Sequence, residues 1–197
     1  MKNKIPFLTR RDFIRGTVGA TLGSSVFGLQ WPRREAMAAS PSLVTVVRDK
    51  NAMDAAKNID IAVLEKMLIE TLARVTGQKN TKDAWLSLVK PNDVIGLVPT
   101  DHLNPTHDEV VEVVKNSLMD AGIPEDSIRD AQGPRNAKKC DALIAIPGLK
   151  AHWLTGIGTV LKNYIMYSGS PSSYHQSNSA KLGEIWNLPF VKGKTKM

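Results

Sequence analysis

Apolar and polar positions follow two periods along this chain, and together they predict alternating strands and helices. Short runs rich in β-branched and aliphatic residues, bounded by proline, glycine or polar residues, predict strands at 43–48, 94–98, 127–130 and 142–146. Apolar residues spaced three and four positions apart predict helices at 59–75, 82–89 and 155–167, and a further helix that begins at Thr106. Alternating strands and helices are typical of an α/β fold with a mainly parallel sheet and flanking helices.

The helix that begins near Thr106 has the clearest boundary signals. Thr106 followed three residues later by Glu109 predicts a capping box, and Gly122 with Pro124 predicts the end of the helix. Residues 188–197 resemble the lead-in to a further strand, with nothing after them to cover it. The pattern therefore also indicates a domain that is incomplete at its C-terminus, a fragment of the whole fold.

The N-terminal segment has the layout of a twin-arginine export signal. Arg10 and Arg11 stand side by side, Phe13 follows, and residues 16–29 form a weakly apolar run interrupted by glycines. That run is shorter than the roughly twenty residues that span a bilayer, and no later apolar run reaches this length. A signal peptide fits this layout, and a stable membrane span does not.

Ala36 and Ala38 form a small-x-small cleavage site at the end of this segment. We therefore expect residues 1–38 to be a signal peptide and residues 39–197 to form the α/β domain. The expected partner during export is the twin-arginine translocase, and the expected location is the periplasm. Because this route carries folded proteins, a bound cofactor becomes more plausible, although none is specified by these residues.

The basic charge of the chain lies mostly in the predicted signal. The formal net charge is +7, but residues 1–38 hold seven of the 26 basic and two of the 19 acidic residues. The rest has 19 basic and 17 acidic residues, which argues against a nucleic-acid partner. Cys140 is the single cysteine, so the chain alone can neither form an internal disulfide nor ligate an iron–sulfur cluster.

The histidines are candidate ligand-binding residues, because all four are predicted in loops or at helix starts. His107 follows the strand at 94–98, His152 follows the strand at 142–146, and His175 lies in a polar loop. Ligands of open α/β sheets bind outside the carboxyl ends of the strands. A metal ion held by His107, His152 and His175 is one hypothesis; the alternative is that they are solvated loop residues.

The segment 146–164 is rich in polar residues suited to holding an anion. Lys150 and His152 lie two apart in extended chain, so their side chains should point the same way. Lys162 and Asn163 should lie about two turns into a helix whose N-terminus, near Thr155, would also favour negative charge. We therefore predict that Lys150, His152 and Lys162 share one pocket; the alternative is a solvated surface.

This segment resembles the signature of the domain of unknown function 362 family. The matching positions are Pro147, Leu149, Lys150, His152, Leu154, Gly156, Lys162, Asn163 and the pair Tyr174-His175, with upstream matches at Ala84-Trp85, at 91–96 and at 106–111. The resemblance implies an α/β fold, export and a pocket at these residues, but no settled activity. The stretch between the strands near Ile128 and Ala142 is shorter than in relatives, and their further C-terminal structure is absent.

Three classes of function stay open on the sequence alone, with no catalytic residue assigned. The protein is either an enzyme or cofactor-dependent redox accessory, a non-catalytic binding protein for a small anion or metal ion, or an inactive fragment. The ligand-binding candidates for the first two classes are the same six residues, His107, Lys150, His152, Lys162, Asn163 and His175.

Replacing both signal arginines tests the predicted export route. In a variant with Arg10→Lys and Arg11→Lys, the precursor should accumulate in the cytoplasm, because the planar guanidinium pair is not reproduced by ammonium groups. Cell fractionation followed by immunoblotting measures this. Normal periplasmic recovery of the double variant contradicts the prediction.

Overall fold

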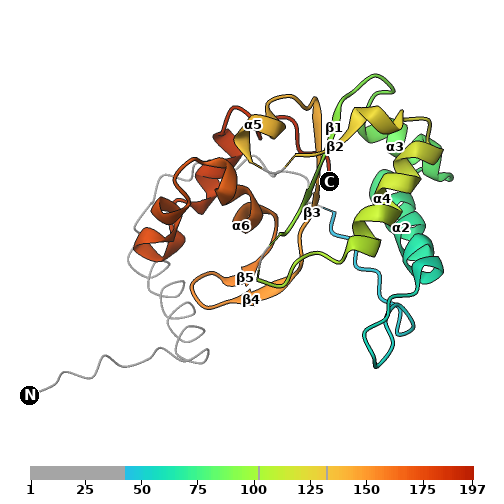
Figure 1. Ribbon diagram of the computed structural model, residues 1–197, viewed down its shortest axis with the longest axis horizontal. Helices are drawn as coiled ribbons and strands as arrows, with labels where there is room; N and C mark the ends of the chain where they lie inside the picture. The colour runs from blue at the N-terminus through green and yellow to red at the C-terminus, as the bar shows by residue number, and fades with distance from the viewer. Residues whose placement is uncertain (1–42, 102, 132) are drawn as a thin grey trace, which may run out of the picture. The chain divides into compact units, whose positions relative to one another are not determined.

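The computed structural model describes residues 43–101, 103–131 and 133–197. Its centre is a three-stranded parallel sheet in the order β2-β1-β3 (Figure 1). The central strand β1, Ile95–Pro99, pairs along one edge with β2, Ile128–Asp130, and along the other with β3, Ala142–Ile146. The predicted α/β class with a mainly parallel sheet is confirmed, as are the strands near 94–98, 127–130 and 142–146.

The C-terminal segment pairs with the free edge of β3. Leu143 and Thr195 form a parallel bridge, and the backbone N–H of Leu143 donates to Lys194 O at 2.8 Å. The N–H of Ala145 donates to Met197 O at 2.9 Å. The strand-like interpretation of the last residues is thereby supported, and the order across the sheet becomes β2, β1, β3 and then residues 194–197.

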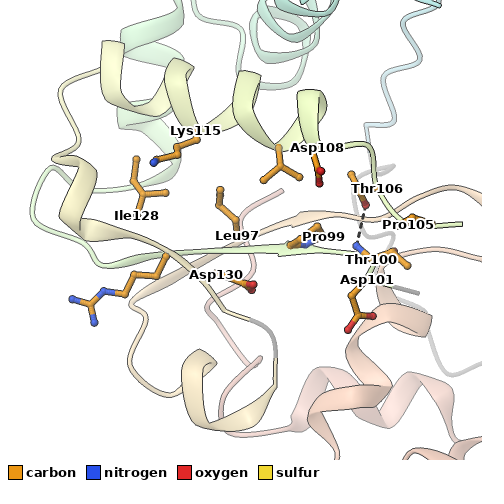
Figure 2. A pocket seen from close by; sticks show the side chains of 12 residues that line it. Leu97, Pro99, Thr100, Asp101, Pro105, Thr106, Asp108, Lys115, Ile128 and Asp130 are labelled. Carbon is orange, nitrogen blue, oxygen red and sulfur yellow. Dashed lines mark hydrogen bonds between the residues drawn. The ribbon is translucent and has the colours of Figure 1, made fainter. Parts of the chain in front are cut away.

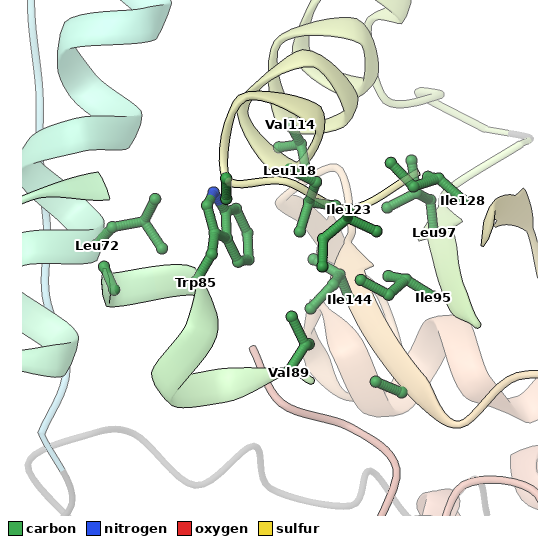
Figure 3. Close-up of a cluster of buried hydrophobic side chains, with 13 residues drawn as sticks. Leu72, Trp85, Val89, Ile95, Leu97, Val114, Leu118, Ile123, Ile128 and Ile144 are labelled. Carbon is green, nitrogen blue, oxygen red and sulfur yellow. The ribbon is translucent and has the colours of Figure 1, made fainter. Parts of the chain in front are cut away.

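Three longer helices cover one face of this sheet: α2, Ile61–Thr76, α3, Thr81–Leu88, and α4, Asp108–Asp120. Ile95 and Leu97 of β1 and Ile144 of β3 point toward them and join the buried cluster in Figure 3. Trp85 of α3 is fully buried in that cluster, and its indole Nε1–H donates to Ser117 Oγ of α4 at 2.8 Å. The indole therefore ties two of the covering helices together.

Short helices cover the opposite face. They are α5, Pro134–Ala137, α6, Val160–Tyr164, and the 3-10 turns η2, Ile165–Tyr167, η3, Pro171–Ser179, and η4, Leu182–Asn187; a further turn, η1, Glu125–Ser127, precedes β2. Successive strand residues point to opposite faces, so Val98 and Leu143 pack here, with Tyr164 and Ile185. Both faces of the central strands are therefore buried, as expected of a parallel sheet.

Helix α2 forms where the apolar period predicted it. The Asp60 side chain accepts the backbone N–H of Val63 at 3.1 Å, and Gly77 ends the helix in the left-handed conformation, with φ 72°. The helix predicted at 82–89 is confirmed as α3. Among the described residues, no helix is both long enough and apolar enough to cross a membrane.

The predicted strand at 43–48 is wrong. The described backbone there has no strand structure, and the side chains of Leu43, Val44 and Val46 are mostly exposed. β-Branched residues suit a pleated, half-buried surface, but a strand forms only where another strand can pair with it. Local composition alone could not supply that partner.

The capping box predicted at Thr106 is also wrong. The N-cap of α4 is His107, without a side-chain hydrogen bond, and Thr106 lies one residue before it. The hydroxyl of Thr106 instead donates to the backbone carbonyl of Ile146 at 2.5 Å. A long-range contact between two strand ends has replaced the local cap.

The predicted helix at 155–167 begins later than the sequence suggested. Gly156–Gly158 is a strand, β5, that pairs antiparallel with β4, Lys150–His152. Only Val160–Tyr164 is α-helical, followed by a 3-10 turn. The anion-favouring helix N-terminus expected near Thr155 is therefore not formed, and Lys162 lies in the middle of the five-residue helix α6.

The export residues Arg10, Arg11 and Phe13 and the cleavage residues Ala36 and Ala38 lie outside the described residues. The predicted signal peptide therefore stays a prediction.

Gly96 is expected to be the most sensitive glycine of the sheet. A Cβ there would lie 2.4 Å from Ala131 Cβ and 2.8 Å from Cys140 Sγ, so Gly96→Ala should destabilise the fold by about 1–3 kcal/mol through overpacking. Urea denaturation measures the change. The matched control is Gly183→Ala, whose Cβ would meet nothing within 4 Å. Equal midpoints for the two variants contradict this packing.

Candidate functional site

A pocket opens at the carboxyl ends of β1 and β3. β1 leads through α4 to β2 at one edge of the sheet, whereas β3 leads to residues 194–197 at the other edge. Chain connections therefore diverge between β1 and β3, and such a point is where open α/β sheets bind ligands. The pocket has a volume of about 280 Å³. Its polar side chains come from the loop after β1, from the β4–β5 hairpin, from α6 and from η3, and the loop after β3 contributes Gly148.

Two threonines hold the loops after β1 and β3 together. Thr106 Oγ1 accepts the N–H of Thr100 at 2.9 Å while donating to Ile146 O. Thr100 Oγ1 in turn accepts the N–H of Gly148 at 3.2 Å. Thr100 is only 4% exposed, so these bonds are shielded from water and fix one loop against the other.

The loop after β1 is held in an unusual backbone conformation. Leu103 and Asn104 both have positive φ, 48° and 68°, which non-glycine residues rarely adopt. The carbonyl of Leu103 accepts a hydrogen bond from Lys150 Nζ at 2.8 Å. A Cβ on Gly148 would lie 2.9 Å from Asn104 O, so this close approach of the two loops needs glycine.

The predicted pair Lys150 and His152 does share this pocket with Lys162. Both lie on the short strand β4, two positions apart, so they point to the same side of the β4–β5 hairpin. The extended backbone predicted for these two residues is present, and the hairpin with β5 holds it in place.

The ring of His152 is held in one tautomer by the backbone that follows it. Its Nδ1 accepts the N–H groups of Leu154 at 3.2 Å and Thr155 at 3.3 Å. An atom that accepts two N–H groups carries no hydrogen, so in the neutral ring the hydrogen is on Nε2. Burial, followed by the charges of Lys162, His175 and Lys150, lowers the pKa of His152 below its ordinary value of 6.5.

Lys162 and His175 form a direct contact on the pocket wall. Lys162 Nζ bonds to His175 Nε2, and His175 Nδ1 lies 3.1 Å from the backbone carbonyl of Pro171. The rings of His152 and His175 have their centroids 6.1 Å apart. Burial lowers the pKa of Lys162, and the charge of Lys150 lowers it further.

Asn163 lines the same pocket, but its amide group is bonded to the backbone of β1. Its Nδ2 donates to the backbone carbonyls of Val98 and Pro99, both at 3.1 Å. An amide nitrogen has two hydrogens, and each is used here, which leaves none for an anion. Asn163 therefore positions α6 against the end of β1.

His107 is the one predicted ligand-binding residue that does not line the pocket. It is exposed at the start of α4, and its neighbours Thr106 and Asp108 line a different cavity. The site therefore joins Lys150, His152, Lys162, Asn163 and His175 but not His107.

The second cavity lies beside α4, at the carboxyl ends of β1 and β2, with a volume of about 460 Å³ (Figure 2). Asp101, Asp108 and Asp130 line it from three different elements, with Lys115 at its upper side in the figure. Lys115 pairs with Glu125 at 2.6 Å. Within the described residues, no three histidine, cysteine or acidic side chains are grouped so that they could hold a metal ion.

Sequence reasoning named five of the residues that line the pocket and missed the others, among them Thr100, Leu103, Trp153 and Met166. The sequence held a signal for Trp153. This tryptophan lies beside His152 at a strand end and belongs to no apolar stripe, so packing in the core does not explain it. It is 88% exposed, and its ring stacks beside His152 with centroids 6.3 Å apart. Thr100 and Leu103 are placed by the conformation of the loop after β1, and Met166 lies in the 3-10 turn η2. Apolar periodicity predicts neither placement.

Comparisons of the chain with protein-family models, with curated proteins and with solved structures found no match. The resemblance to the domain of unknown function 362 family therefore stays a prediction, and the site is interpreted from its own chemistry.

The pKa of His152 tests the hydrogen bonds and neighbouring charges described for its ring. A proton NMR titration should give a value below 6.5, because a proton on Nδ1 would face two N–H donors in a partly buried, cationic pocket. Since the unfolded ring binds protons more readily, His152 should make the fold less stable as pH falls from 6.5 to its folded pKa.

Two variants serve as controls for this titration. Lys162→Met removes a neighbouring charge and should move the pKa of His152 upward. His152→Asn keeps an acceptor near the Nδ1 position and should lose part of the acid sensitivity of the melting temperature. A wild-type value at or above 6.5 contradicts the assigned tautomer and surroundings.

Proposed function

We propose that this protein is exported by the twin-arginine route and binds a small organic anion in the pocket between β1 and β3. The observation that carries the proposal is the charge of the pocket. Lys150, Lys162, His152 and His175 all line it, and no aspartate or glutamate is among its described lining residues. A carboxylate or phosphate there would receive charge-assisted hydrogen bonds.

The ligand should be organic because much of the lining is apolar. Leu103, Trp153, Ile165 and Met166 contribute side chains to the pocket, and Leu103 and Trp153 are 79% and 88% exposed. Exposed apolar side chains beside fixed polar groups are typical of small-molecule sites. They would cover the hydrocarbon part of a ligand whose anionic group reaches the lysines.

A metal ion fits these side chains less well than an anion. The lone pair of His152 on Nδ1 already accepts two backbone N–H groups, and Nε2 of His175 faces an ammonium group. Two lysines in the same lining would repel a cation. These contacts favour the anion-binding alternative over the metal-binding hypothesis for His152 and His175.

Benzoate and its neutral isostere benzamide test the proposal on the full mature chain. Isothermal titration calorimetry should detect benzoate and give much weaker binding of benzamide, because only the carboxylate can pair with the lysines. Lys150→Met and Lys162→Met should each weaken benzoate binding about 10- to 100-fold, which corresponds to the roughly 1.5–3 kcal/mol of one charged hydrogen bond.

Lys66→Met is the matched control. Lys66 is an exposed lysine of α2 outside the pocket lining, so its loss should leave benzoate affinity unchanged. Equal affinity for benzoate and benzamide, or equal losses in all three lysine variants, would overturn the anion-binding proposal.

A further inference from the structure

The contact between Lys162 and His175 does more than place a positive charge in the pocket. His175 Nδ1 lies 3.1 Å from the carbonyl oxygen of Pro171, which can only accept, so Nδ1 carries the ring hydrogen. Nε2 of His175 is then an acceptor, and it faces Lys162 Nζ. The lysine ammonium therefore points one of its protons at a neutral base.

The surroundings of Lys162 favour the neutral amine. The side chain is half-buried on the pocket wall, and burial together with the charge of Lys150 lowers its pKa. Desolvation and a neighbouring cation are two recognised means by which an enzyme makes a lysine nucleophilic.

Lys150 is placed to bind a carboxylate and not to act as a nucleophile. Its Nζ is anchored on Leu103 O at 2.8 Å, a bond that uses one hydrogen of the ammonium group. His152 presents its Nε2–H from the same side of β4. Both groups are suited to a carboxylate, whereas Lys162 has a proton acceptor of its own.

We propose that Lys162 is a nucleophile that forms an imine with a small carbonyl-bearing carboxylate, such as a 2-oxo acid, bound in this pocket. This inference rests on the proposed anion-binding function and names its ligand class. Lys150 and His152 hold the carboxylate, and His175 takes the proton that leaves Lys162.

The reaction balances without an oxidant or reductant. His175 accepts a proton from the Lys162 ammonium, and the free amine adds to the carbonyl carbon. A proton then moves from the attacking nitrogen to the carbonyl oxygen, which becomes a hydroxyl. Return of the proton from His175 lets that hydroxyl leave as water, and a protonated imine remains. One C–N double bond has replaced one C–O double bond, and the net charge is unchanged.

Reductive trapping tests this step directly in the full mature chain. The protein is incubated with pyruvate and sodium cyanoborohydride at neutral pH, and the labelled lysines are located by peptide mass spectrometry. One reduced pyruvyl adduct should form on Lys162, at least about ten times faster than on any other lysine, since burial lowers its pKa and a histidine nitrogen contacts its amine. Adducts spread evenly over the lysines would overturn the assignment.

Variants separate the nucleophile from its surroundings. Lys162→Arg keeps the charge but should abolish the adduct, whereas Lys66→Arg should change nothing. His175→Phe should slow trapping while the adduct remains on Lys162, because a ring of similar size without a base is left. Unchanged trapping in Lys162→Arg contradicts the proposal.

Lactate distinguishes failure of this inference from failure of the proposed function, since it has the carboxylate of pyruvate but no carbonyl. Calorimetric binding of both acids without an adduct on Lys162 would reject the imine and leave the anion site standing. Absence of binding by both acids, together with no adduct, would reject both proposals.

Discussion

The amide of Asn163 donates both of its hydrogens to the last carbonyls of β1, and the pocket depends on that pair of bonds. Carbonyls at the end of a buried strand need hydrogen-bond partners, because leaving them unpaired is costly. By satisfying them, Asn163 fixes the start of α6 against the strand end. Lys162, the preceding residue, is thereby brought to the pocket wall.

The second fixed point is the pair of threonines between the two strand ends. Thr106 and Thr100 each accept an N–H, and Thr106 also donates to Ile146 O. These bonds close the loop after β1 onto the loop after β3. Lys150 can then reach Leu103 O although the two residues are far apart in the sequence. A polar network that is partly shielded from water gives such a site a defined geometry.

Gathering two lysines and two histidines in one pocket costs free energy unless some of them stay neutral. Backbone groups fix whether Nδ1 of each histidine ring donates or accepts a hydrogen bond. Leu154 and Thr155 donate to His152 Nδ1, and Pro171 O accepts from His175 Nδ1. These bonds fix Nδ1 of His152 as an acceptor and Nδ1 of His175 as a donor. An incoming anion would relieve the remaining repulsion between the lysines, which is the physical link between this fold and ligand binding.

The sequence by itself determined the α/β class, the three strands of the parallel sheet and helices α2 and α3. It also predicted that Lys150, His152 and Lys162 share one pocket. Both predictions succeeded because apolar periodicity and residue spacing are local properties of the chain. The sequence wrongly predicted a strand at 43–48, a capping box at Thr106 and an earlier start for α6. Residues 43–48 lack a strand to pair with, Thr106 bonds to Ile146 instead of capping its own helix, and 156–158 pair with the neighbouring strand β4 instead of starting a helix. Only the tertiary structure placed His107 outside the pocket, bonded the Asn163 amide to the end of β1 and brought Lys162 into contact with His175. Side-chain partners across the sheet end depend on how the loops fold over it, and no spacing along the chain encodes that.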